Sequence, residues 1–300
     1  MLHSCSKDKG RRRQCQRRTA ADGKRSGTHP RNRQPGGNVR RNRRSAQVND
    51  MSPTIPRQFG QSERDAELFR LVRRGETARI REAVDGGADP EARERFGATP
   101  MLSAVGNRRL DVIRLLAEAG ADPDTPRLGM DEFTPLHAAA QRDSLESVLL
   151  LLELGADVTK RTWLTPIDWA VSRPVVEALV AAGGDPNARC PRTGQTPLHR
   201  RACTSLLEPM AALLDAGADH SARDLLDRTP LHHVTLGHRR GDVAMAVALL
   251  LGAGANAEAR DHRGKTVLQL ARRRRDIIAI RALARAGIGG TAPVRAELAA

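Results

Sequence analysis

The chain has 300 residues, of which 39% are hydrophobic but only 2% are aromatic, and it contains no tyrosine. A core of this composition must be built from Leu, Ala, Val and Ile, which suits packed small helices better than a β-sandwich or barrel. No apolar run approaches the ~20 residues that a membrane-spanning helix needs, and the N-terminus lacks the apolar segment of a secretory signal. We therefore expect a cytoplasmic protein that does not associate with membranes, and secretion as an effector stays open.

The formal net charge of +15 is concentrated at the N-terminus. Residues 1–61 hold sixteen Lys and Arg against three Asp, so this segment carries +13 and the remainder is nearly neutral. Its runs RRRQCQRR at 11–18 and RRNRR at 40–44 lie among Gly, Pro, Asn and Ser without hydrophobic periodicity. Residues 1–61 are therefore predicted to be a disordered Arg-rich segment.

Three explanations of the basic segment stay open. A basic arm, residues 1–50, would bind nucleic-acid phosphates and lose affinity steeply with salt, although it has no aromatic side chain to stack on bases. A secretion or targeting segment is the second explanation. The third is that translation starts at Met51, because GC-rich upstream DNA would encode an Arg-rich, Lys-poor stretch. The same arginine bias indicates a GC-rich genome and leads us to expect a bacterial source.

Residues 134–158, TPLHAAAQRDSLESVLLLLELGADV, contain the signals for two short helices. Thr134 is suited to the N-cap position and Pro135 to the first helical position. The second helix, 145–154, is apolar almost all round at 148–152 and must be covered on several sides. Gly155 supplies the left-handed residue that ends it. This unit is too small to bury its own leucines.

The same unit recurs, so the leucines can be buried by stacking copies. Starting threonines spaced 31 to 37 residues apart are Thr99, Thr134, Thr165, Thr196, Thr229 and Thr266. Gly-Ala-Asp-like terminators begin at Gly86, Gly120, Gly155, Gly183, Gly217 and Gly254. With this period, the segments TPLHAAA (134–140), TPLHRRA (196–202) and TPLHHV (229–234) resemble ankyrin repeats. The resemblance implies an all-α solenoid of six to seven helix-turn-helix units with β-hairpin-like finger loops, over residues 62–288, and a frayed tail at 289–300.

The resemblance also implies a structural role for the repeated motif. In ankyrin repeats the histidine bonds back to the threonine and links neighbouring units. The motif residues are Thr134, Pro135, His137, Thr196, Pro197, His199, Thr229, Pro230 and His232. No further ligand lies at the close spacing of a zinc site, and the four scattered cysteines form no CxxC pair, which is typical of reduced thiols. We expect no metal site and no cofactor.

An enzyme using His232, His233 and Asp242 is the least favoured alternative. These residues cluster in the sequence and are of types used for acid–base work. However, the chain shows no nucleophile motif, no Gly-rich phosphate loop and no HExxH. We therefore predict a protein that is not an enzyme and has no catalytic residues, although fold alone would not decide this.

The residue after each histidine slot is expected to face a concave groove. These residues form a column of Ser103, Ala138, Trp169, Arg200, His233 and Leu270. Trp and Arg dominate binding hot spots, so Trp169, Arg200 and His233 are predicted contacts. We expect Arg142 and Arg173 nearby, in a groove suited to an acidic peptide, and Trp163, Leu225 and Leu226 on the fingers as exposed apolar contacts. The alternative for Trp169 is that it fills space left by a shortened loop in its own repeat.

The sequence thus predicts a monomeric, non-enzymatic module that binds a partner protein or peptide through its concave surface. The alternative is a nucleic-acid-associated protein whose residues 1–50 bind phosphate while the repeats recruit a protein. Binding that disappears with salt and with deletion of residues 1–50 would distinguish the second from the first.

Overall fold

The computed structural model describes residues 63–129, 133–160, 163–237 and 242–288, all of which belong to one compact unit, Thr54–Ala300. The predictions for the basic segment, for a start at Met51 and for the tail 289–300 lie outside the described residues. Within the described ranges, no helix is long and apolar enough to cross a membrane.

The described residues form α-helices and no strands. The helices are α1 (Glu63–Arg74), α2 (Thr77–Asp85), α3 (Pro100–Gly106), α4 (Leu110–Glu118), α5 (Pro135–Gln141), α6 (Leu145–Glu153), α7 (Pro166–Trp169), α8 (Arg173–Ala181), α9 (Pro197–Thr204), α10 (Leu207–Asp215), α11 (Pro230–Leu236), α12 (Val243–Gly252), α13 (Val267–Arg273) and α14 (Ile277–Arg285). They make seven consecutive helix pairs, which confirms the predicted all-α solenoid.

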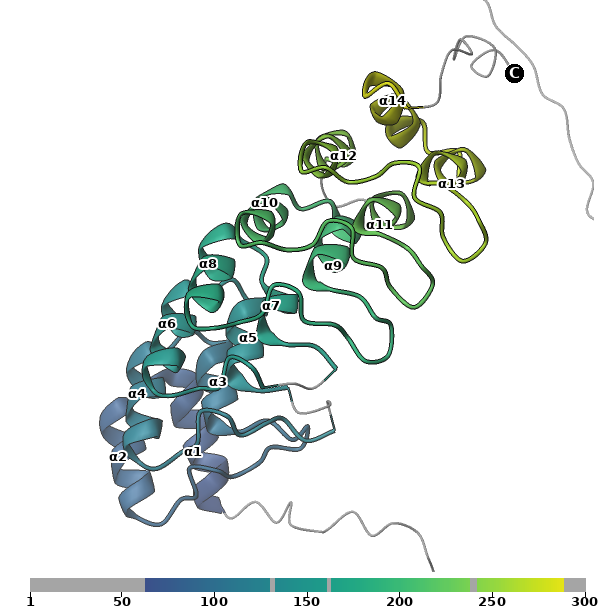
Figure 1. Ribbon diagram of the computed structural model, residues 1–300. Helices are drawn as coiled ribbons and strands as arrows, with labels where there is room; N and C mark the ends of the chain where they lie inside the picture. The colour runs from purple at the N-terminus through teal and green to yellow at the C-terminus, as the bar shows by residue number, and fades with distance from the viewer. Residues whose placement is uncertain (1–62, 130–132, 161–162, 238–241, 289–300) are drawn as a thin grey trace, which may run out of the picture. The chain divides into compact units, whose positions relative to one another are not determined.

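The pairs stack so that odd-numbered and even-numbered helices form two rows (Figure 1). We call the odd-numbered row the inner helices and the even-numbered row the outer helices. A finger, the loop that joins each outer helix to the next inner helix, projects beside the inner row.

Six inner helices start in the same way because the same motif precedes them. Each begins after a threonine with extended backbone, and the first residue of all but α13 is proline. At the other end of a unit, Gly155 has φ of 90°, and the amide of Ala156 donates to the carbonyl of Leu151 at 2.9 Å. A residue with a side chain would be strained at that φ, which explains the recurring glycine after the outer helices.

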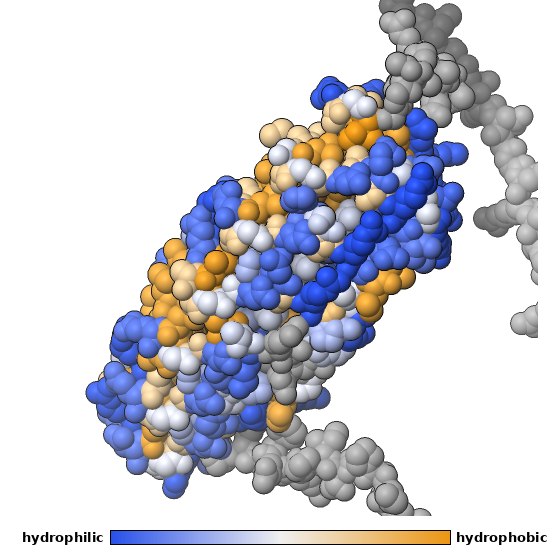
Figure 2. Space-filling model, in the orientation of Figure 1, coloured by the Kyte–Doolittle hydropathy of each residue, from blue (hydrophilic) through white to orange (hydrophobic). Residues whose placement is uncertain are grey.

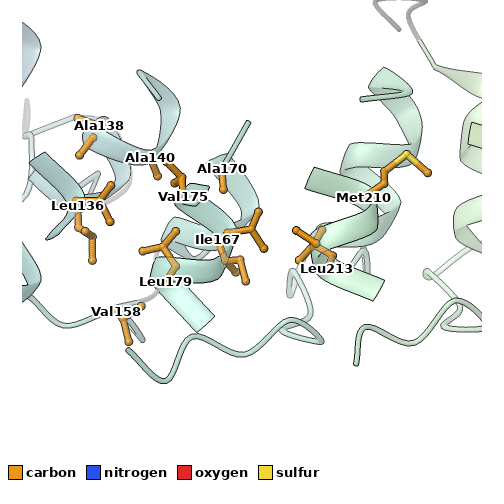
Figure 3. Close-up of a cluster of buried hydrophobic side chains, with 14 of the residues drawn as sticks. Leu136, Ala138, Ala140, Val158, Ile167, Ala170, Val175, Leu179, Met210 and Leu213 are labelled. Carbon is orange, nitrogen blue, oxygen red and sulfur yellow. The ribbon is translucent and has the colours of Figure 1, made fainter. Parts of the chain in front are cut away.

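The hydrophobic core is continuous from one pair to the next (Figure 3). Leu136 of α5, Ile167 of α7 and Leu179 of α8 are almost completely buried, as are Met210 and Leu213 of α10. No single pair could cover these side chains, so burial comes from the neighbouring units.

The fingers are hairpin-like turns, in which the amides of Cys190, Asp224 and Asp261 donate across the finger to the carbonyls of Gln195, Arg228 and Lys265 at 2.8, 2.9 and 3.0 Å. Among the described residues, Arg127 and Phe133 form one isolated β-bridge, and no finger contains a strand. Neighbouring fingers are tied together, since the Leu225 amide donates to the Thr193 carbonyl at 2.9 Å and Arg223 Nη1 donates to the Arg260 carbonyl at 2.9 Å. These bonds hold the fingers in a fixed row.

Helix α7 is shorter than the other inner helices, and Arg201 of α9 compensates for this. The buried Arg201 guanidinium donates to the carbonyls of Asp168 at 2.9 Å and Ala170 at 3.1 Å, at the end of α7. Burial lowers the pKa of Arg201 to about 10, which still leaves it charged at neutral pH. In similar repeats this position holds a small alanine. The long side chain of Arg201 instead reaches the end of α7 and donates to backbone carbonyls that the short helix leaves without a helical partner.

Candidate functional site

A pocket of about 420 Å³ lies where the inner helices α5, α7 and α9 meet three fingers. The helices contribute Gln141, Trp169 and Arg200. The fingers contribute Arg127, Phe133, Trp163, Leu164, Cys190, Arg192 and Thr193. The pocket is therefore shared by consecutive repeats and depends on how they stack.

Aromatic rings form the apolar part of the pocket. The ring centroids of Phe133 and Trp169 lie 5.5 Å apart with an interplanar angle of 89°, an edge-to-face arrangement that stabilises both rings. Phe133 also lies 5.5 Å from the ring of His137. Trp169 is half-buried and packs against the core, so its position is fixed while one part of the indole lines the pocket.

Arginine side chains form the polar part of the pocket. Arg192 Cζ lies 3.4 Å from the ring centroid of Trp163, and Arg200 Cζ lies 5.6 Å from that of Trp169. Both are cation–π contacts, which leave the in-plane N–H groups of a stacked guanidinium available to another acceptor. Among the described residues that line the pocket, three are arginines and none is acidic.

Asp168 lies behind Arg200 without neutralising it by a hydrogen bond. Arg200 Nε is 3.9 Å from Asp168 Oδ1, which is too long for a hydrogen bond. The other carboxylate oxygen of Asp168 accepts from the amide and the hydroxyl of Thr165 at 2.9 and 3.1 Å. Burial raises the pKa of Asp168. Arg200 therefore keeps donor capacity toward the pocket.

The structure brings together three of the residues predicted to contact a partner: Trp163, Trp169 and Arg200. Leu225 and Leu226, exposed by 66% and 40%, lie on the finger that follows the pocket. Leu225 is joined through its amide to Thr193, a lining residue.

Three other predicted contacts do not line the pocket. Arg142 is exposed at the C-terminal end of α5. Arg173 lies on the outer helix α8, where its Nη1 donates to Glu177 at 3.1 Å and to Asp215 at 2.8 Å. His233 is only 6% exposed, and its Nε2 lies 2.9 Å from Asp224 Oδ2.

His233 is therefore a correction to the predicted contact surface. The position after the histidine slot is also buried at Ala138 and Leu270, so the expected column reaches the surface only where the side chain is large or the neighbouring unit leaves room. At His233 the imidazole is buried and hydrogen-bonds the carboxylate of Asp224 on the preceding finger.

The motif histidines link successive units. His137 Nδ1 lies 3.3 Å from the amide nitrogen of Thr134, and because an amide can only donate, Nδ1 accepts and Nε2 carries the proton. His137 Nε2 then donates to the Leu164 carbonyl of the next unit at 3.1 Å. His199 makes the corresponding bonds at 3.2 and 2.9 Å, and His232 at 3.2 and 3.3 Å. Burial lowers the pKa of His137 and of His199 to about 4.

The residues of the enzyme alternative have separate structural partners. His232 bonds to Thr229 and to the Lys265 carbonyl, and the carboxylate of Asp242 accepts the Met245 amide at 3.0 Å at the start of α12. Within the residues that the structure describes, no group of three or more His, Cys, Asp or Glu is placed to hold a metal ion.

Sequence reasoning missed the pocket's finger residues Phe133, Arg192 and Arg127. The repeat register places all three on fingers, but finger lengths vary, so spacing alone does not show which finger side chain meets Trp169. Arg192 could have been singled out from the sequence, because it stands four residues before Thr196, on the finger that follows the finger of Trp163.

Comparisons with known proteins agree with this architecture. A family model, ankyrin repeats in three copies, matches residues 68–162. The E3 ubiquitin-protein ligase KEG of Arabidopsis thaliana is 26% identical over 64% of this chain and 13% of its own length. A putative palmitoyltransferase, ZDHHC13 of Danio rerio, is 30% identical over 68% of this chain and 32% of its own.

Solved structures agree as well. The human ASB11 ankyrin repeat domain matches with a TM-score of 0.64 and 25% identity, covering 75% of this chain and 99% of that domain. The ankyrin repeat domain of Bcl-3, a member of the IkappaB family, matches with a TM-score of 0.59 and 25% identity, covering 72% of this chain and 97% of that domain.

The stacked pairs and the shared pocket thus define an ankyrin-repeat solenoid, a fold that generally serves as a non-enzymatic interaction scaffold. Residues 68–162 are thus similar to ankyrin repeats, and the described residues share the fold of solved ankyrin repeat domains. The chain spans only 13% and 32% of the two relatives named above. Those relatives come from a plant and an animal and give no support to the expected bacterial source.

Proposed function

We propose that the repeat domain is a non-enzymatic module that binds a segment of a partner protein through its inner helices and fingers, with the aromatic pocket as the centre. The observation that carries this proposal is the combination of Trp163, Trp169 and Phe133 with three arginines in one pocket of about 420 Å³. Ligand pockets commonly fall between ~300 and 1,000 Å³, so one bulky side chain would fill this one.

The aromatic part favours an apolar side chain of the partner. Phe133 and Trp169 present ring faces and edges that are already held by packing, so little conformational entropy would be lost on binding. Trp is among the residue types that contribute most to binding free energy when a partner covers it.

The arginines favour a carboxylate next to that side chain. Arg192 and Arg200 are each held against an indole, and no described lining residue is acidic. A guanidinium pairs with a carboxylate through two parallel N–H donors. We therefore propose a partner segment in which a bulky apolar residue stands next to Asp or Glu.

A second apolar surface offers a useful comparison. Apolar atoms gather over the outer helices α8, α10 and α12 (Figure 2), where Met245 is 55% exposed. A pocket on this surface, between α10 and α12, is lined by neither aromatic rings nor arginines among the described residues. We therefore use the outer row for controls.

Selection of displayed random peptides on the full chain tests the proposal. We expect enriched peptides to contain a bulky apolar residue beside an acidic one. Their dissociation constants should rise by about tenfold or more in Trp169→Ala/Arg200→Gln, which corresponds to a loss of ~1.4 kcal/mol or more.

The matched control is Leu149→Ala/Arg114→Gln, which removes an exposed leucine of α6 and an exposed arginine of α4 from the outer row. This control should keep the affinity of the unchanged chain. Equal affinities for the pocket variant and the unchanged chain, at unchanged melting temperatures, would contradict the proposal.

A further inference from the structure

The outward face of the outer helices changes along the stack. The residues two, six and nine positions before the positive-φ glycine that ends each outer helix lie on one face of that helix, and they are exposed or half-buried in all seven described outer helices. In α2, α4, α6, α8 and α10 this face carries one or two acidic residues, such as Glu146 and Glu153 of α6. In the part of the chain that the structure describes, only α12 and α14 have none. The outer row therefore loses its acidic character at its last two helices.

Apolar side chains and arginines take the place of the acidic residues in these two helices. The outward residues there are Met245, Ala248 and Gly252 of α12 and Ile278, Arg281 and Arg285 of α14. Met245 is 55% exposed and Ile278 is 46% exposed, and they occupy equivalent positions in two helices that pack against each other. Ile277, at the start of α14, is 47% exposed. We call Met245, Ile277, Ile278, Arg281 and Arg285 the terminal outer surface.

Four further arginines lead into the terminal outer surface. Arg272–Arg275 are exposed at the end of α13 and in the turn before α14. The last helix pair thus has six arginines against one acidic residue, Asp276, which is buried and accepts the Ala279 amide at 3.1 Å. Asp242, at the start of α12, accepts the Met245 amide at 3.0 Å and so caps its own helix. Among the described residues, no ion pair joins any of the six arginines to an acidic side chain, so their positive charge is available to a partner.

The first helix pair shows that a polar end of the stack does not require an excess of arginine. Residues 63–85 also contain six arginines, but six acidic residues accompany them. Arg70 Nη1 lies 2.6 Å from Glu67 Oε2, and Arg79 Nη1 lies 2.8 Å from Glu76 Oε2. A terminal repeat needs a polar outer face, and balanced charges supply one in the first pair. The excess of positive charge in the last pair therefore needs another explanation.

We infer that the terminal outer surface binds the anionic surface of a lipid membrane. Arginines near a membrane are attracted to anionic headgroups, and exposed apolar side chains enter the boundary between the headgroups and the acyl chains. Both parts of the surface thus gain a partner, whereas a nucleic acid would pair with the arginines and leave Met245, Ile277 and Ile278 in water. The sequence expectation of no membrane association rested on the lack of a spanning helix and of a secretory signal, which peripheral binding does not need. The pocket of the proposed function lies on other helices, so this inference is independent of it.

Oxidation of Met245 by hydrogen peroxide, followed by peptide mapping of the full chain, tests the inference. The probe is a vesicle of phosphatidylcholine with about 30% phosphatidylserine, and vesicles of phosphatidylcholine alone are the neutral control. We expect the anionic vesicles to slow the oxidation of Met245 by about fivefold or more and the neutral vesicles to leave it unchanged. Residues 1–61, which carry +13, also attract anionic vesicles, but binding through them alone would leave Met245 accessible.

Two variants of α14 separate the charged and the apolar contributions. Arg281→Gln/Arg285→Gln and Ile278→Ser should each reduce the protection of Met245 to about twofold or less, because each removes one of the two parts of the surface. All three side chains are exposed, so these substitutions should leave the fold intact.

The matched controls change the same residue types elsewhere on the outer row. Arg79→Gln/Arg81→Gln on α2 removes two exposed arginines, and Leu149→Ser on α6 alters an exposed leucine. Both controls should keep the full protection. An oxidation rate that anionic vesicles leave unchanged, or protection that persists in both α14 variants, would overturn the inference. Equal protection by a random-sequence oligonucleotide would overturn it as well, because the surface would then bind polyanions in general.

Discussion

In five inner helices the side chain at the third position accepts the amide of the capping threonine, and three residue types do this. His137 accepts at 3.3 Å, Asp168 at 2.9 Å and Gln269 at 3.2 Å. The histidine differs because its second nitrogen donates to a carbonyl of the following unit. His, Asp and Gln can all accept the amide of the capping threonine. The additional bond to a carbonyl of the following unit is made by the second nitrogen of the neutral imidazole.

We predict that the motif histidines make the fold sensitive to acid. The pKa of buried His137 is about 4, against ~6.5 in the unfolded chain, so between these values the unfolded state binds more protons. The stabilising contribution is complete above about pH 6.5 and is lost as the pH falls toward 4. His233 has the opposite sign, because a raised pKa contributes stability that is lost as the pH rises through it.

Comparison with His137→Gln isolates this effect, since glutamine fills the same position in the last repeat. Urea unfolding at pH 7 and pH 5 should show that the unchanged chain loses about 2 kcal/mol more than the variant over this interval. Equal losses in the two proteins would show that His137 does not titrate as described.

We predict that Arg201→Met destabilises the protein by about 2–3 kcal/mol, because methionine fills similar space but leaves the carbonyls of Asp168 and Ala170 without their donors. Arg200→Met, one position earlier and half-exposed, is the control and should cost less than ~1 kcal/mol. Denaturant unfolding measures both, and similar losses for the two variants would argue against the proposed role of Arg201.

Residue contacts within a motif could be predicted from the sequence, and contacts between units could not. The spacing of Thr134 and His137 sets their bond, because both lie in one turn of helix. The burial of His233 depends on Asp224 from the preceding finger, and the position of Trp169 depends on Phe133 from another. Such contacts follow from finger conformation, which the repeat period does not determine.

At the scale of elements, α7 explains why the pocket is where it is. Its short inner helix ends at Trp169, and Ala170 turns the chain with φ of −59° and ψ of 130°. The sequence predicted a shortened loop in this repeat, but not the guanidinium of Arg201 that completes the helix end. Trp169 both packs against the core and lines the pocket, so the space-filling alternative and the contact role are compatible.

The two faces of α6 should respond differently to the same substitution. Leu151 is completely buried between units, and Leu149 is 51% exposed. Leu151→Ala should lower the free energy of unfolding by about 2–5 kcal/mol because it leaves a cavity, whereas Leu149→Ala should change it by ~0.5 kcal/mol or less. Thermal unfolding measures this difference, and equal melting temperatures for the two variants would contradict the described stacking.

At the scale of the whole repeat domain, a short sequence motif repeated along the chain determines the fold. We propose that the residues that depart from this motif form the functional surface. Threonine caps, terminal glycines and buried leucines recur along the stack, with threonine caps in six of the seven described helix pairs, and they could be predicted from their period. The short α7, the long Arg201 and the aromatic fingers depart from the period, and they gather around one pocket. This is the physical reason why we place partner binding there.

A photo-crosslinking amino acid placed at Gln141, on the exposed edge of the pocket, tests the central claim most directly. In native lysate we predict a crosslink to a discrete protein that is lost when Trp169→Ala and Arg200→Gln are added and is absent when the crosslinker replaces Leu149 on the outer row. Crosslinks that form from Leu149 but not from Gln141, or that persist in the double variant, would contradict the assignment of the pocket as the partner-binding site.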